Sequence, residues 1–148
     1  MSKNISTFLL LAALGVSTGL VHAQNNSNSL LPTVFTSLET AMQYPSNVYH
    51  LDLSYQGLTQ FPEEILQMEN LRVLNLSGNY ISELPQNLSK IHHMEELYLN
   101  NNLFAVFPQP VFQLNKLRVL EMLENGTPIL DFVEGVSRIN KKISMQID

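Results

Sequence analysis

A spacing of 23 residues runs through this chain and constrains its fold more than any other feature. Three consecutive units, 48–70, 71–93 and 94–116, place apolar side chains at the same seven offsets. In the second unit these are Leu71, Leu74, Leu76, Ile81, Leu84, Leu88 and Ile91. Recurrence in register predicts a solenoid in which each unit forms one coil and buries its apolar side chains against its neighbours.

Each unit also carries two residues that shape a turn. The asparagine and proline of the second unit, Asn79 and Pro85, recur as Asn102 and Pro108. The first unit has Pro62 but places Gln56 at the asparagine position. We expect the asparagines to form a ladder of hydrogen bonds to neighbouring coils, and Gln56 to serve less well. The recurring prolines and glycines argue against a bundle of long helices.

The pattern L-x-x-L-x-L-x-x-N-x-L-x-x-L-P resembles the 23-residue kind of leucine-rich repeat. A short predicted helix that runs into the segment 48–54 resembles the entry segment of secreted bacterial members of that family. The resemblance covers residues 48–116 almost throughout. It implies an α/β fold, a right-handed solenoid with a parallel sheet on its concave face and short helical or extended segments on its convex face. The alternation in Leu74-Asn75-Leu76 is that of a half-buried strand, which agrees with this fold.

The last part of the chain departs from the pattern. A fourth unit, 117–139, begins well, but Asp131 replaces the proline and Glu134 stands where leucine is expected. The spacing then places Ile143 and Met145 in phase with Leu120 and Met122, which predicts a closing strand within 140–148. We therefore expect the repeat domain to span residues 48–148.

An N-terminal cap is predicted over residues 35–47. Thr36-Ser37-Leu38-Glu39 has the form of a capping box, which opens a short helix through Met42 until Pro45 stops it. Residues 24–34 are rich in Asn and Ser and are expected to form a flexible leader.

Residues 1–23 have the features of a signal peptide. Lys3 precedes a short apolar run over 8–16, and Val21-His22-Ala23 offers small residues for cleavage before Gln24. No stretch is apolar enough over ~20 residues to predict a membrane span. The chain has no cysteine, so disulfides and a lipid-anchored cysteine are excluded. We expect a bacterial protein that is secreted or periplasmic.

The resemblance implies that ligands bind to the outward strand residues of the concave face. One column lies directly before the first of the two strand leucines, as Val73 lies before Leu74, and the other lies between them, as Asn75 lies between Leu74 and Leu76. The candidate binding residues are His50, Asp52, Val73, Asn75, Glu96, Tyr98, Val119 and Glu121, with Lys142 and Ser144 completing the columns in the closing strand. Tyr98 among Asn75, Glu96 and Glu121 has the character of an aromatic anchor in a polar patch, which favours a protein or peptide partner. The acidic residues favour a basic partner.

Other classes of function find less support. The net charge of −5 is the wrong sign for binding nucleic acid. His92-His93 has no further metal ligand at a suitable spacing, and no Gly-rich phosphate loop or G-x-S-x-G motif accompanies His50 and Asp52. The adjacent glutamates of the Glu95-Glu96 pair do not face each other as catalytic carboxylates would. The sequence thus predicts a protein that is not an enzyme and needs no cofactor.

Two alternatives stay open. A binder of carbohydrate or of a cell-envelope polymer would use exposed tyrosines to stack on sugars, and the candidates are Tyr49, Tyr55, Tyr80 and Tyr98. A hydrolase is disfavoured by the missing catalytic motifs. The leading prediction is a non-enzymatic module that recognises a protein or peptide.

Overall fold

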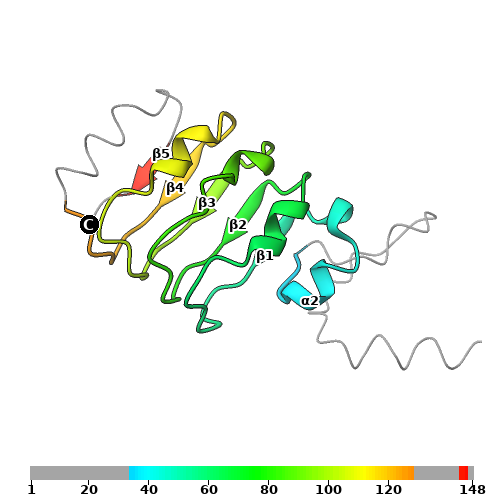
Figure 1. The fold of residues 1–148 in the computed structure, drawn as a ribbon, viewed down its shortest axis with the longest axis horizontal. Coiled ribbons are helices and arrows are strands. Elements are labelled where there is room, and N and C mark those ends of the chain that lie inside the picture. The colour runs from blue at the N-terminus through cyan, green and yellow to red at the C-terminus, as the bar shows by residue number, and fades with distance from the viewer. Residues whose placement is uncertain (1–33, 129–143, 147–148) are drawn as a thin grey trace, which may run out of the picture.

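The computed structural model describes residues 34–128 and 144–146, and within these ranges its strands form one parallel sheet (Figure 1). The strands follow one another in chain order, and they are β1 (His50–Asp52), β2 (Val73–Asn75), β3 (Glu96–Tyr98), β4 (Val119–Glu121) and β5 (Ser144–Gln146). The predicted signal peptide, most of the predicted leader and most of the irregular half of the fourth unit lie outside the described residues.

The interior is a stack of apolar side chains, because the middle residue of each of the first four strands points inward. Leu51, Leu74, Leu97 and Leu120 pair in register across the sheet and are fully or almost fully buried. Short 3₁₀ helices return the chain on the other side of this core, namely η3 (Glu63–Gln67), η4 (Leu88–Lys90) and η5 (Gln109–Gln113). Pro62 and Pro108 directly precede η3 and η5, where a fixed φ and a missing N–H are tolerated.

The N-terminal end of the stack is covered by the short helix α2 (Leu38–Ala41), followed by the 3₁₀ helix η2 (Pro45–Asn47) (Figure 1). Phe35 is buried and forms a parallel bridge with Leu51. The Phe35 N–H donates to the His50 carbonyl at 3.0 Å, and the Asp52 N–H donates to the Phe35 carbonyl at 2.8 Å. These bonds occupy backbone groups of the edge strand β1 that would otherwise be open to another chain.

The capping box predicted at Thr36 does not form. Ser37 is the N-cap, and its hydroxyl accepts a hydrogen bond from the Thr40 N–H at 3.4 Å. Thr36 follows Phe35 in the bridge to the sheet, and its carbonyl accepts a bond from the Gln56 side chain. The helix therefore starts one residue later than predicted, which moves Glu39 out of the position that a capping box requires.

The predicted asparagine ladder is present. The Asn79 amide nitrogen donates to the carbonyls of Leu53 at 3.0 Å and Leu76 at 2.8 Å, while its oxygen accepts from the N–H groups of Gln56 and Leu58. The later coils bond their neighbours in the same way through Asn102 and Asn125. The Gln56 side chain does not join the ladder: it is exposed, and its amide donates to the Thr36 carbonyl. The extra methylene thus moves its amide out of the buried turn.

A second column of equivalent residues has a left-handed backbone. The residue three positions after each strand has a positive φ, and these residues are Tyr55, Gly78, Asn101 and Glu124. Their N–H groups bond to the next coil, as in Tyr55 to the Ser77 carbonyl and Gly78 to the Asn100 carbonyl. The coil geometry therefore imposes a conformation that disfavours most side chains. Only Gly78 meets this requirement without cost.

Three glycines allow the effect of this conformation to be measured. Gly78 and Gly57 both have a positive φ, but a methyl group added at Gly78 would clash with the Tyr55 ring, whereas one added at Gly57 would lie in open space. At Gly126 it would make only ordinary contacts, the nearest at 3.6 Å. We expect Gly126→Ala to leave the free energy of unfolding almost unchanged and Gly57→Ala to lower it by about 1 kcal/mol. Gly78→Ala should cost more, because the Tyr55 ring must also move.

Urea unfolding of the three variants checks this order. Equal losses at Gly57 and Gly78 would show that the Tyr55 ring moves aside freely. A loss at Gly126 as large as that at Gly57 would contradict the role of φ.

The closing strand is present, but its register differs from the prediction. Met145 pairs with Leu120 and Ser144 pairs with Val119, so β5 lies two residues further along the chain than the 23-residue spacing gives. Gln146, rather than Ser144, is in register with Glu121. The connection from β4 to β5 is thus longer than the others by an even number of residues, which preserves the alternation between the two faces of the sheet.

Candidate functional site

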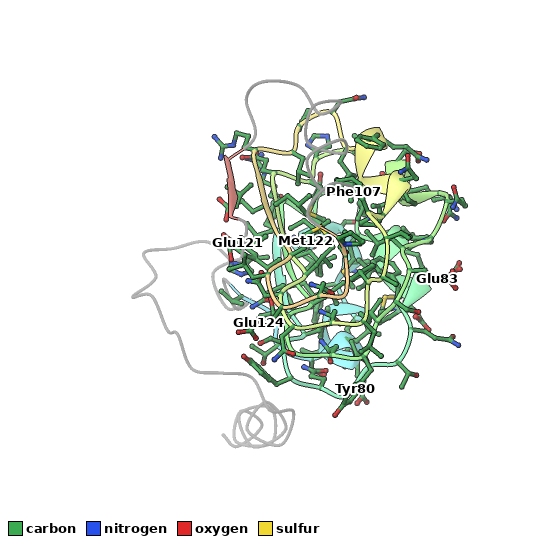
Figure 2. All side chains as sticks on the ribbon, turned by 90° about the vertical axis from the view of Figure 1, so that its left-hand side faces the viewer. Tyr80, Glu83, Phe107, Glu121, Met122 and Glu124 are labelled. Atoms are coloured by element: carbon green, nitrogen blue, oxygen red, sulfur yellow. The ribbon has the colours of Figure 1, made fainter. Side chains whose placement is uncertain are left out.

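Eight side chains project from the solvent side of β1 to β4, and we call this surface the strand face. Each of these strands has a buried middle residue between two partly exposed ones. The strand face therefore consists of the predicted residues His50, Asp52, Val73, Asn75, Glu96, Tyr98, Val119 and Glu121. Figure 2 shows Glu121 on this side and Glu83 on the opposite flank of the coils. Lys142 lies outside the described residues.

The middle of the strand face is organised by hydrogen bonds between side chains. The Tyr98 hydroxyl donates to a Glu96 carboxylate oxygen at 2.8 Å. In the same coil as Tyr98, the Asn100 amide donates to a Glu121 carboxylate oxygen of the next coil at 2.8 Å, and the Asn100 side-chain oxygen accepts from the Leu123 N–H. Because Tyr98 and Glu121 pair in register, these two groups form one continuous patch.

The first two coils fix their outward side chains against their own turns. An Asp52 carboxylate oxygen accepts from the Ser54 N–H at 2.9 Å, and the Asn75 amide oxygen accepts from the Ser77 N–H at 3.0 Å. These are local side-chain to backbone bonds of the kind that Asp and Asn favour in turns. They orient both groups before any ligand arrives.

Charged residues also line the edge at which the strands begin. Glu95 accepts from two arginines of neighbouring coils, with Arg118 at 2.7 Å and Arg72 at 3.4 Å. All three are partly exposed, so each pair adds little to stability. The two arginines more than balance the charge of Glu95, so this cluster carries a net positive charge beside the start of the strands.

Two groups in this region were missed by sequence reasoning. Asn100 was not among the candidate residues because it follows the strand, although it holds Glu121 in place. The sequence does contain a signal for the charged edge, because Arg72, Glu95 and Arg118 recur at the spacing of the coil. A comparison of the charges at equivalent positions of successive coils would have revealed this cluster.

The tyrosines proposed for stacking on sugars do not share one surface. Tyr98 lies on the strand face, while Tyr49 precedes β1 at the opposite end of the strand. Tyr55 and Tyr80 lie in the turns after β1 and β2 and are 77% and 59% exposed. The four rings therefore occupy different positions around the coil and form no single aromatic row.

The histidine pair has no metal partners in the part of the chain that the structure describes. His92 and His93 have ring centres 4.5 Å apart in an edge-to-face arrangement. Partial burial, followed by the positive charge of Lys116, lowers the pKa of His93. Across the described ranges no group of three His, Asp or Glu side chains could hold a metal ion, and no helix there is long and apolar enough to cross a membrane.

The bond between Tyr98 and Glu96 has a measurable signature. This bond, together with burial and the charges of Glu96 and Glu121, raises the pKa of Tyr98 from 10.0 to about 12. We expect Glu96→Gln to lower the pKa of Tyr98 toward 10.0, because glutamine can accept the hydrogen bond but does not repel the phenolate. The ultraviolet absorbance of the phenolate, with Tyr98→Phe to identify the signal, measures this shift.

The sign of the linked stability follows from the direction of the shift. The folded state holds the Tyr98 proton more tightly than the unfolded state. Its contribution to stability is therefore complete below pH 10.0 and is lost as the pH rises through about 12. An unchanged Tyr98 titration in Glu96→Gln would contradict this assignment.

Comparison with known proteins supports one family. Residues 46–104 match the family model described as Leucine rich repeat. The structure is similar to an internalin (inlF) from Listeria monocytogenes, with a TM-score of 0.57, 18% identity, and coverage of 76% of this chain and 31% of that chain. It is also similar to a TDR receptor, with a TM-score of 0.52, 24% identity, and coverage of 70% and 20%.

A leucine-rich repeat protein from Leptospira interrogans matches with a TM-score of 0.43, 22% identity, and coverage of 78% of this chain and 41% of that chain. The chain thus spans less than half the length of each of these proteins. A search of the curated proteins found no match.

Stacked coils with a parallel sheet on one side and short helices on the other define a solenoid repeat protein. The fold is a leucine-rich repeat solenoid, as the sequence predicts, and residues 46–104 match the leucine-rich repeat model.

Proposed function

We propose that this protein is a non-enzymatic module that recognises a protein or peptide through the strand face. The observation that carries the proposal is the composition of that face. A partly exposed aromatic ring, two partly exposed valines and three carboxylates lie together on a surface that the core does not use. Such a mixture of an aromatic anchor, apolar contacts and oriented polar groups is typical of protein interfaces.

The rigidity of the strand face supports the same proposal. Asp52, Asn75, Glu96 and Glu121 are each held by a hydrogen bond within the protein. A surface whose side chains are already ordered loses less entropy when it binds. We further propose that the module acts outside the cytoplasm, because residues 1–23 have the features of a signal peptide.

Selection from a phage-displayed library of random 12-residue peptides tests the proposed function. The full chain is immobilised, and synthetic copies of the selected peptides are measured by fluorescence anisotropy. Tyr98→Ala should weaken their binding by about tenfold or more, as expected for an anchor residue. Glu83→Ala on the opposite flank is the control and should leave binding unchanged (Figure 2).

Circular dichroism must show that both variants are folded. Peptides that bind Tyr98→Ala as tightly as the parent but lose affinity for Glu83→Ala would place recognition on the other side of the coils. Binding of glycans on an array, with no peptide selected, would favour the carbohydrate alternative.

A further inference from the structure

The carboxylates of the strand face are oriented but not neutralised. Asp52, Glu96 and Glu121 each accept a hydrogen bond from an uncharged donor, which is the Ser54 N–H, the Tyr98 hydroxyl or the Asn100 amide. Within residues 34–128, none of the three forms an ion pair. Within the described residues, the protein therefore fixes the positions of these groups without pairing them with a cation.

Glu95, the residue before Glu96, is in contrast paired with positively charged side chains. Glu95 directly precedes Glu96 in the sequence, yet Glu95 lies just before the start of β3 and pairs with two arginines. Arg72 and Arg118 thus compensate the edge and not the strand face. Adjacent residues of the same type have opposite electrostatic roles because successive residues near a strand point in different directions.

No lysine or arginine stands at an outward position of β1 to β4, and His50 is the only basic residue among them. The strand face therefore carries a local excess of negative charge. A partner that covers Glu96 with apolar groups alone would bury a charge without a counterion, which costs free energy. A partner that brings a cation avoids this cost and is attracted from a distance.

The apolar residues of the strand face indicate which side chains of a partner would flank its cationic group. Val73 and Val119 pair in register with Glu96 on either side, so one carboxylate lies between two valines along a column of the sheet. Neighbouring strands are ~4.8 Å apart, which is within reach of adjacent side chains of one bound segment. The Tyr98 ring lies beside the same carboxylate and can contact the alkyl stem or the face of a cationic group.

We propose that the strand face recognises a protein segment that presents a lysine or arginine between apolar side chains. The cationic group lies against Glu96 and Glu121 beside the Tyr98 ring, and the apolar side chains contact Val73 and Val119. The inference rests on the proposed function and specifies the chemistry of its partner.

The test uses the same phage-displayed library of random 12-residue peptides on the immobilised full chain. Peptides selected on the parent protein should be enriched in lysine or arginine flanked by apolar residues. Selection on a Glu96→Gln, Glu121→Gln variant should lose this enrichment, since both side chains keep their shape but lose their charge. A Glu83→Gln variant, which removes one charge from the opposite flank, should retain it.

A synthetic pair then isolates the cation. In a selected peptide that contains arginine, replacement by citrulline keeps the shape and removes the charge. We expect this replacement to weaken binding by about tenfold, as for loss of one charge-assisted hydrogen bond. Binding of the arginine peptide should also weaken as salt is added, while binding of the citrulline peptide should change less.

The outcomes separate this inference from the proposed function. If selected peptides lose affinity for Tyr98→Ala but show no enrichment of cations and no sensitivity to citrulline, the inference is wrong and the proposed function stands. If no selected peptide depends on Tyr98, on Glu96 or on Glu121, both are wrong.

Discussion

Replacing Leu97 with alanine is expected to lower the free energy of unfolding by about 2 to 5 kcal/mol. Leu97 is 1% exposed and lies in the middle strand β3, in register with Leu74 and Leu120 on both sides. A cavity at this position removes contacts with two neighbouring coils at once. Because each coil of a solenoid is stabilised by its neighbours, weakening both interfaces of one coil threatens the whole stack. The loss would be a large fraction of the stability of a typical domain.

Leu103→Ala is the matched control for this substitution. Leu103 belongs to the same coil but is 55% exposed, so its truncation should change the free energy of unfolding by less than about 0.5 kcal/mol. Urea unfolding followed by circular dichroism compares the two variants. Similar losses in both would mean that the stack of strand leucines is not the main source of stability.

Replacing Asn102 with alanine is expected to lower the free energy of unfolding by about 3 kcal/mol, although Asn102 does not belong to the strand face. The Asn102 amide donates to the Leu76 and Leu99 carbonyls, and its oxygen accepts from the Ile81 N–H. These backbone groups lie in a turn between coils where Asn102 itself is buried. Each group left without a partner costs about 1 to 3 kcal/mol, and water can recover only part of this.

Asn87→Ala provides the comparison for the ladder. Asn87 is exposed at the start of η4 and makes no capping hydrogen bond with its side chain. Its replacement should leave the unfolding midpoint in urea nearly unchanged, whereas Asn102→Ala should lower it clearly. A small effect at Asn102 would indicate that water replaces the ladder bonds, and hydrogen exchange at the Ile81 N–H would then be fast.

Most of the stack was predictable because the repeat itself determines it. The register of β1 to β4 follows from the spacing of Leu51, Leu74, Leu97 and Leu120, since a shift by one residue would expose every strand leucine. The burial of Asn79 and Asn102 likewise follows from their recurrence next to apolar positions. These features depend on interactions that each coil repeats.

Features that occur once were harder to predict. The register of β5 depends on the length of an irregular connection, which the 23-residue spacing does not describe. The N-cap moved from Thr36 to Ser37 because Phe35 bonds to β1, a tertiary contact that a local capping motif does not reveal. The left-handed backbone at Tyr55 is equally hidden, because only the ladder of coils requires it.

The candidate site divides in the same way. The eight outward residues of β1 to β4 could be named from strand alternation alone, because the alternation fixes which side chains leave the core. Their electrostatic state could not. The charge of this surface depends on contacts between side chains of neighbouring coils, such as Arg118 with Glu95 and Asn100 with Glu121. These contacts form only in the folded protein.

The described strands bond to one another in chain order, and this arrangement also determines how the stack responds to force. Tension applied between the two ends of the stack would separate the coils one after another. Each coil of 23 residues would then release roughly 80 Å of chain at ~3.5 Å per residue. The extension of the chain under force would therefore occur in steps of about one coil.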